Sequence, residues 1–276
     1  MHKKALEITC YVGGAGAFGV FARWLQDQMA FDEAGLNEPS FWNFAVPLLM
    51  IATMYMAHRF TRIFKKERYF LPDDFRQALA NPGRLYTILR WAIGIIMCAG
   101  AVLLLASCET DQDALFLQIL SVLGFLTGLS FPWILGSANK EEEPNMDLIC
   151  IASTLPILFF AFWLITSYKM NDINSVVWAY VIEIFTVSAG MLSFFRVAGF
   201  AFGAPKLFKA MDWAMFGAFM FIMSLADERY MGMQLMLLSA GLMLVLYNWI
   251  MIANLQQKPA PIKNYAAEDD GFERLR

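Results

Sequence analysis

The sequence predicts an all-α integral membrane protein with eight transmembrane helices, arranged as two tandem parallel four-helix repeats. Three observations predict this class: the composition, the length of the apolar runs and the distribution of Lys and Arg. Of 276 residues, 59% are hydrophobic and 16% are charged, and the mean hydropathy is +0.50. Soluble domains are about 45–50% apolar and about 25% charged. The composition therefore excludes a disordered chain, a fibrous protein and an ordinary cytosolic enzyme.

The apolar runs define the spans. A helix needs about 20 residues to cross the hydrocarbon core of a bilayer, and only helices or closed barrels satisfy the backbone there. The runs are long and do not show the short alternation typical of barrel strands, so they predict helices. The eight predicted spans are Ile8–Leu25, Phe41–Phe60, Tyr86–Ser107, Ala114–Ser137, Leu148–Ser167, Val176–Phe202, Leu207–Ala226 and Met233–Leu255.

The basic residues set the orientation. If the N-terminus is cytoplasmic, all of the 21 Lys and Arg residues fall on the cytoplasmic side except Arg23, Lys169 and Arg229. Cytoplasmic loops carry such an excess of positive charge. We therefore predict a multi-pass protein of the cell (plasma) membrane with both termini in the cytoplasm. Its predicted partner is the lipid bilayer, and no nucleic-acid partner is predicted.

Tryptophan positions predict the repeat. Each predicted span carries one of the eight tryptophans near one end, in the order outer, outer, inner, inner, and the order then recurs. Trp prefers the membrane interface, which explains the end placement but not the recurrence. We predict one repeat over 1–138 and a second over 148–255, related by an axis along the membrane normal. Residues 139–147 form a predicted cytoplasmic linker, and 256–276 a predicted disordered cytoplasmic tail.

The long cytoplasmic segment Thr61–Leu85 contains a predicted interfacial helix. Asp73 or Asp74 is a suitable N-cap, and an Asn-Pro-Gly sequence ends the helix. Phe75 and Leu79 are then expected to lie on the membrane surface. This segment and the C-terminal tail are predicted docking places for a cytosolic partner, and a homo-oligomer is the alternative assembly.

Small-residue spacings predict where helices approach closely. The four spacings of this kind are Gly124-x-x-x-Gly128, Gly199-x-x-x-Gly203, Gly13-x-x-x-Ala17 and Ala15-x-x-x-Gly19.

Glu183 is the strongest candidate for a functional residue, because an ionisable group within a span is costly. It lies five residues from Trp178, which corresponds to about 7–8 Å below the outer interface. Thr186 and Ser193 share its helix face. These side chains either line a substrate or ion path, or form a polar tie between helices.

Other ionisable and polar side chains near this stripe have two interpretations. Tyr180, one turn above Glu183, is either a gate or an interfacial tyrosine, and Arg196 either lines the path or reaches the inner headgroups. Arg23, Arg90 and Asp212 lie near span ends and are predicted to anchor the protein at the interface.

Catalytic and metal chemistry have little support in the sequence. The two histidines, His2 and His58, do not suffice for a metal site. No phosphate-binding loop and no serine-hydrolase motif is present. The sequence therefore predicts no catalytic residue, no cofactor and no metal.

The segment Phe31–Leu36, with the sequence FDEAGL, resembles a loop motif of uncharacterised polytopic membrane proteins of clostridial bacteria. The resemblance implies a bacterial membrane protein. It implies no activity and no site residue.

Three functions are compatible with these features. The first is a transporter or permease for a small solute or ion, with its path near Glu183. The second is a non-catalytic membrane subunit, sensor or assembly factor that docks a cytosolic partner. The third, a lipid-modifying membrane enzyme, has the least support because the sequence offers no nucleophile–base set.

The predicted orientation has a direct test. A fluorescent protein fused to either terminus should fluoresce, because it folds in the cytoplasm. Alkaline phosphatase fused after Asn171 should be active and fused after Lys140 should be inactive, since these positions lie on opposite sides of the membrane. The reverse pattern would place both termini outside.

Overall fold

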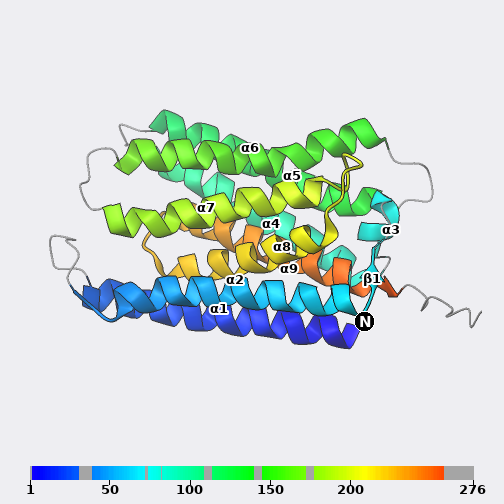
Figure 1. Ribbon diagram of the computed structural model, residues 1–276. Helices are drawn as coiled ribbons and strands as arrows, with labels where there is room; N and C mark the ends of the chain where they lie inside the picture. The colour runs from blue at the N-terminus through cyan, green and yellow to red at the C-terminus, as the bar shows by residue number, and fades with distance from the viewer. Residues whose placement is uncertain are drawn as a thin grey trace, which may run out of the picture.

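The computed structural model describes residues 2–30, 39–71, 74–81, 83–108, 114–139, 145–171 and 177–257, with the backbone alone for 171 and 177–180. Long helices form a single bundle (Figure 1). In chain order the elements are α1 (His2–Ala30), α2 (Trp42–Lys66), β1 (Tyr69–Phe70), α3 (Phe75–Leu79), α4 (Arg84–Ser107), α5 (Ala114–Ser137), α6 (Met146–Asn171), α7 (Val177–Ala198), α8 (Leu207–Met223), the 3-10 helix η1 (Ser224–Ala226), α9 (Met231–Ala253) and β2 (Gln256–Gln257).

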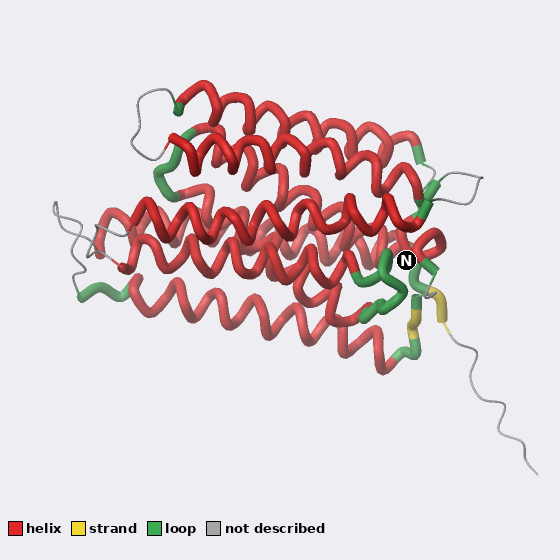
Figure 2. The backbone as a smooth tube through the Cα atoms, turned by 90° about the horizontal axis from the view of Figure 1, so that it is seen from above, coloured by secondary structure: helices red, strands yellow, loops and turns green. Residues whose placement is uncertain are grey.

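The long helices run side by side, so the bundle has two ends (Figures 1 and 2). The N-terminus, α3 and the two strands lie at one end, which we call the termini end. The connection from α8 through η1 to α9 lies at the other, which we call the opposite end.

Seven helices are long and apolar enough to cross a membrane: α1, α4, α5, α6, α7, α8 with η1, and α9. The protein is therefore an all-α, multi-spanning membrane protein. The count of eight is not confirmed, because α2 is not among the seven. The sequence placed the end of this span at Phe60, but the helix continues through Thr61 to Lys66, with Lys65 and Lys66 in its last turn. Its final turns are thus polar, although α2 lies beside α1 along the bundle.

The centre of the bundle is formed by α8 and α9. In their most apolar windows 67% and 72% of the residues are buried, against 33% in α1 and α4. Helices α1, α2, α7 and α9 pack on α8, and α1, α4 and α8 pack on α9. The central pair is therefore shielded from lipid by its neighbours.

The packing does not show the predicted two-fold relation between halves. A two-fold axis would pair α4 with α6 as α1 pairs with α8, and α5 with α8 as α4 pairs with α9. In the part of the chain that is described, α1–α8 and α4–α9 pack closely, whereas α4–α6 and α5–α8 are not among the closely packed pairs. The tandem repeat stays a prediction from the sequence.

Glycines allow α4 to approach two neighbours closely. A β-carbon added to Gly94 would lie 2.7 Å from the carbonyl oxygen of Gly128 on α5, and one added to Gly100 would lie 2.7 Å from that of Gly232 on α9. Gly128 thus acts as its spacing predicted. A side chain at these positions would force the backbones apart.

Two other small-residue predictions are wrong. Gly199 and Gly203 follow the end of α7, and Gly203 has φ of +68°, so they form a turn rather than a helix contact. On α1 nothing lies within 4 Å of a β-carbon at Gly13. The face that packs on α8 carries Gly16 and Gly19, next to Ile222, Met223 and Phe219, so Gly19 of the predicted Ala15-x-x-x-Gly19 spacing does lie at a close helix contact.

The short helix α3 confirms its predicted N-cap, since the Asp74 side chain accepts from the backbone N–H of Arg76 at 3.3 Å. Phe75 and Leu79 do not lie on the membrane, however. Both are buried in the bundle core, and Asn254 donates to the Ala78 and Ala80 carbonyls at 2.9 Å each. The sequence could not distinguish an apolar face that meets lipid from one that meets α9.

The segment after Leu255 begins with β2, which pairs antiparallel with β1. The remainder of the predicted tail, 258–276, lies outside the described residues, as does most of the predicted linker 139–147.

A leucine at Gly94 or Gly128 should destabilise the bundle by about 1–3 kcal/mol, because overpacking forces the two backbones to separate. Gly13→Leu is the matched control and should leave the free energy of unfolding unchanged, since space is open there. Steric trapping in detergent measures all three variants. An equal decrease in the free energy of unfolding for Gly13→Leu and Gly128→Leu would contradict this packing.

Candidate functional site

Glu183 accepts hydrogen bonds from two neighbours on α6. The indole Nε1 of Trp163 donates to its Oε1 at 2.8 Å, and the hydroxyl of Ser167 donates to the same oxygen at 2.5 Å. The second carboxylate oxygen faces Nε of Arg229 at 3.4 Å. Glu183 is thus paired with a cation and bonded through both oxygens.

Arg229 continues the chain of charges toward α1. Its Nη2 lies 2.8 Å from Oδ2 of Asp227, and Oδ1 of Asp227 accepts from Nε of Arg23 at 2.6 Å. The two guanidinium side chains are only 6% and 2% exposed. Two cations and two anions make this four-charge network (Glu183, Arg229, Asp227 and Arg23) neutral.

Neutral polar groups extend the network to further helices. Arg23 donates to Gln26 Oε1 at 2.7 Å, and Gln26 donates to Asn43 Oδ1 on α2 at 3.2 Å. Gln234 of α9 donates to the Asp227 carbonyl at 3.2 Å. The network therefore joins α1, α2, α6, α7 and α9 at the opposite end.

The network corrects the prediction for Arg23 and shows why basic residues occur on the predicted outer side. Arg23 is not an interface anchor, because it is buried in an ion pair. Two of the three basic residues on the predicted outer side, Arg23 and Arg229, are neutralised by buried acids. They therefore do not contribute free positive charge to that side, while Lys169 is exposed.

The predicted stripe along α7 faces the bundle interior. Thr186 and Ser193 are both 0% exposed. Thr186 bonds to the carbonyl of Ile182 at 2.8 Å, and Ser193 donates to the carbonyls of Ala189 and of Trp213 on α8, each at 2.6 Å. This geometry favours a tie between helices over an open path.

The other two residues of the predicted path lie apart from Glu183. The side chain of Tyr180 lies outside the described part of the chain. Arg196 is near the termini end of α7, with its guanidinium carbon 5.6 Å from the Phe195 ring centre and its Nε buried without a partner among the described residues. The structure therefore brings Thr186, but not Arg196, close to Glu183 along α7.

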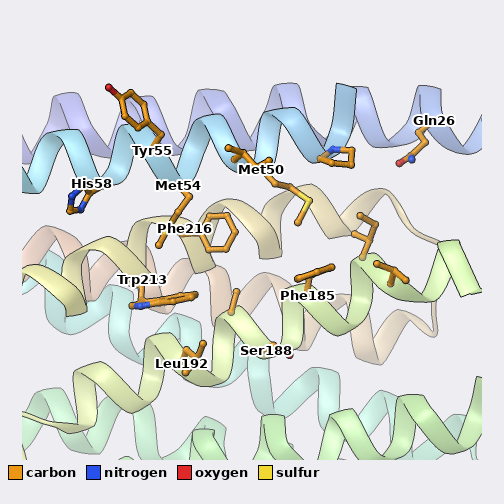
Figure 3. Close-up of a pocket in the computed structure, with 15 residues that line it drawn as sticks. Gln26, Met50, Met54, Tyr55, His58, Phe185, Ser188, Leu192, Trp213 and Phe216 are labelled. Atoms are coloured by element: carbon orange, nitrogen blue, oxygen red, sulfur yellow. The ribbon is translucent and has the colours of Figure 1, made fainter. Parts of the chain in front are cut away.

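A large groove lies on the other face of α7. Helices α2 and α7 both pack on α8, but they are not a closely packed pair among the described helices. The groove between them has a volume of about 980 Å³ and is lined almost entirely by apolar side chains (Figure 3). Its lining residues on α2 recur at helical spacing: Pro47, Met50, Ile51, Met54, Tyr55 and His58.

The walls and floor of the groove come from different helices. Met50 and Met54 extend from α2, Phe185 and Leu192 belong to α7, and Trp213 and Phe216 form the floor on α8 (Figure 3). Tyr55 points away from α7. Ile51 and Phe185, which line the groove, are 68% and 55% exposed, so the groove opens on the outer surface of the bundle.

Polar groups mark the two ends of the groove (Figure 3). Gln26, which belongs to the polar network, lies at one end. His58 lies toward the termini end, with its Nδ1 3.3 Å from Oδ2 of Asp212. The other oxygen of Asp212 accepts from the hydroxyl of Thr61 at 2.6 Å. Asp212 is thus bonded inside the protein, and the prediction that it anchors the interface is wrong.

His58 is the residue that the sequence reasoning missed. Its side chain is 51% exposed, whereas Asp212 is 12% exposed. In the described part of the chain, Nδ1 faces the Asp212 carboxyl group and no hydrogen bond to Nε2 is found. The pair is 154 residues apart, so no local spacing reveals it. The available indication of the pair was that His58 and Asp212 are both ionisable and both lie within predicted spans.

No family model, no curated protein and no solved structure matches this chain. The Phe31–Leu36 segment lies outside the described residues, and its resemblance stays a prediction. Among the described residues no cluster of three His, Cys, Asp or Glu side chains is arranged to hold a metal.

Removing one charge from the four-charge network should destabilise the protein strongly. Glu183→Gln or Arg229→Gln should each cost about 3–5 kcal/mol, because each leaves a buried partner uncompensated. The double variant restores neutrality, so its loss should be smaller than the sum of the single losses. A double-mutant cycle on the free energy of unfolding measures this.

Lys169→Gln is the control, since this lysine is exposed, and a change within about 0.5 kcal/mol is expected. Additive losses in the double variant would show that Glu183 and Arg229 act independently.

Proposed function

We propose that this chain is a membrane protein that takes a single long-chain amphipathic molecule from the bilayer into the groove between α2 and α7. The observation that carries the proposal is the groove itself, which is wide, mostly apolar and has Gln26 at one end and His58 at the other (Figure 3). Ligand sites of this kind are mostly apolar, with a few polar groups that fix the ligand's orientation.

The dimensions suit a lipid chain. Pro47 and His58 on α2, and Val181 and Leu192 on α7, bound the groove. Each pair is separated by a helix rise of about 16 Å, roughly half of the hydrocarbon core. The volume of about 980 Å³ lies at the upper end of the about 300–1,000 Å³ typical of ligand pockets.

The proposal includes transport, but the proposed substrate site is the groove and not the α7 face that carries Glu183, Thr186 and Ser193. A path beside Glu183 would require Arg229, Trp163 and Ser167 to release the carboxylate. The groove needs no such opening. We place the protein in the plasma membrane, with α2 as an eighth span and both termini in the cytoplasm, as the charge distribution predicts.

Docking of a cytosolic partner on 61–85 has less support. The apolar side of α3 is already covered by the bundle, and Asn254 occupies the carbonyls at its end.

An enzyme acting on lipid is a second candidate, favoured by the His58–Asp212 pair at the groove. A carboxylate that orients a histidine is typical of general-base catalysis. Among the described residues no hydroxyl or thiol bonds to the His58 imidazole, since the Thr61 hydroxyl bonds to the His58 backbone carbonyl and to Asp212. Water would therefore be the attacking group. Mass spectrometry of lipids incubated with the protein and with His58→Asn would detect such hydrolysis; identical lipids in both would dismiss it.

Filling the groove should abolish binding. Ser188 lines the groove on α7. The Ser188→Trp side chain would occupy the middle of the groove, away from the four-charge network and from the His58–Asp212 pair. We expect a diazirine-labelled fatty acid to crosslink to α2 and α7 in the native protein, and this labelling to fall about tenfold in the variant, because displaced apolar contact is worth about 1.5–3 kcal/mol per large side chain. Peptide mapping by mass spectrometry measures the labelling.

Ile95→Trp is the matched control, since Ile95 is exposed on α4 away from the groove. It should leave the labelling of α2 and α7 unchanged. Labelling spread evenly over all lipid-facing helices in the native protein would contradict the proposal.

A further inference from the structure

We infer that the groove selects a lipid with an anionic headgroup, held by Arg62, Arg196 and Lys209 at the termini end. The inference rests on the proposed function, because it names the class of molecule that the same groove receives.

The three basic residues continue the groove on its three helices. Arg62 follows His58 by four residues on α2, and Arg196 follows Leu192 by four on α7. Lys209 precedes Trp213 by four on α8. Residues four apart lie on the same helix face, one turn along. Each wall of the groove, and its floor, is therefore extended toward the termini end by one basic residue.

Their depth suits a headgroup. Arg62 lies in the final turns of α2, Arg196 lies near the end of α7 and Lys209 lies in the first turn of α8. Helix ends of a spanning bundle lie at the membrane interface, where lipid headgroups are found. A chain in the groove would therefore place its headgroup level with these side chains.

The two ends of the groove differ in whether their basic residues are paired with carboxylates. At the opposite end, Arg23 and Arg229 are paired with Asp227 and Glu183. At the termini end, no carboxylate in the described part of the chain forms an ion pair with Arg62, Arg196 or Lys209.

Arg196 shows the need for a partner most clearly. Its Nε is buried and has no hydrogen-bond partner among the described residues. The terminal guanidinium nitrogens of Arg196 are not among the buried unpartnered atoms of the described residues, and a phosphate group provides several acceptor oxygens that pair well with them. His58 lies between this basic group and the apolar lining, where it can contact the linkage between headgroup and chain.

The experiment uses the full-length protein in nanodiscs of phosphatidylcholine with a minor fraction of phosphatidylglycerol. After extraction in mild detergent, native mass spectrometry measures the ratio of the two lipids retained per protein. We expect enrichment of phosphatidylglycerol over its fraction in the disc. Arg62→Gln, Arg196→Gln and Lys209→Gln should each reduce this enrichment about fivefold.

Arg84→Gln is the matched control, since Arg84 is an exposed basic residue at the termini end of α4, away from the groove. It should leave the enrichment unchanged. An equal reduction in this control would overturn the inference, because it would show attraction to the charge of the whole end.

The test separates the two proposals. If the native protein retains both lipids in the disc ratio, and Ser188→Trp abolishes retention, the headgroup inference is overturned while the groove still binds lipid. If the native protein retains neither lipid, the proposed function fails and the inference fails with it.

Discussion

The neutral chain of charges from Glu183 through Arg229 and Asp227 to Arg23 is the constraint on which the rest of the structure depends. Charges in a low-dielectric interior are stable only when they are paired and hydrogen-bonded. Here each guanidinium meets at least one carboxylate. These residues come from α1, α7 and the connection between η1 and α9. Because unpaired ions are costly to bury, these three segments have to meet at one place, where the charges can pair.

That meeting point also shapes the groove. Gln26 bonds to Arg23 and to Asn43 of α2, and it lines the groove at the same time. On the other side, Glu183 holds α7 to α6 and to Arg229. Helices α2 and α7 are thus both fixed at the opposite end, while α8 separates them. The groove thus has Gln26 of the polar network at that end and mostly apolar side chains along the rest of its lining.

Local features were predictable from the sequence, but pairings were not. The apolar runs predicted the seven helices that are long and apolar enough to cross a membrane, and the Asp74 cap follows from residues adjacent to it. The errors have one physical cause: an apolar or charged side chain does not specify what it meets. Phe75 was expected on lipid and lies on protein, and Arg23 was expected at headgroups and pairs with Asp227, 204 residues away. Only the folded bundle selects between these environments.

The charge distribution that predicts the orientation of the chain also predicts a polarity for the groove. Basic residues remain on the cytoplasmic side during insertion whatever their later role. The charge distribution predicts that Arg62, Arg196 and Lys209 lie on that side, and the groove ends one helical turn before each of them. At the opposite end, Arg23 and Arg229 are paired within the neutral network, and the exposed Lys169 does not line the groove. A molecule with one charged end and one apolar chain therefore has a single favourable orientation in the groove, with its anionic end toward the termini.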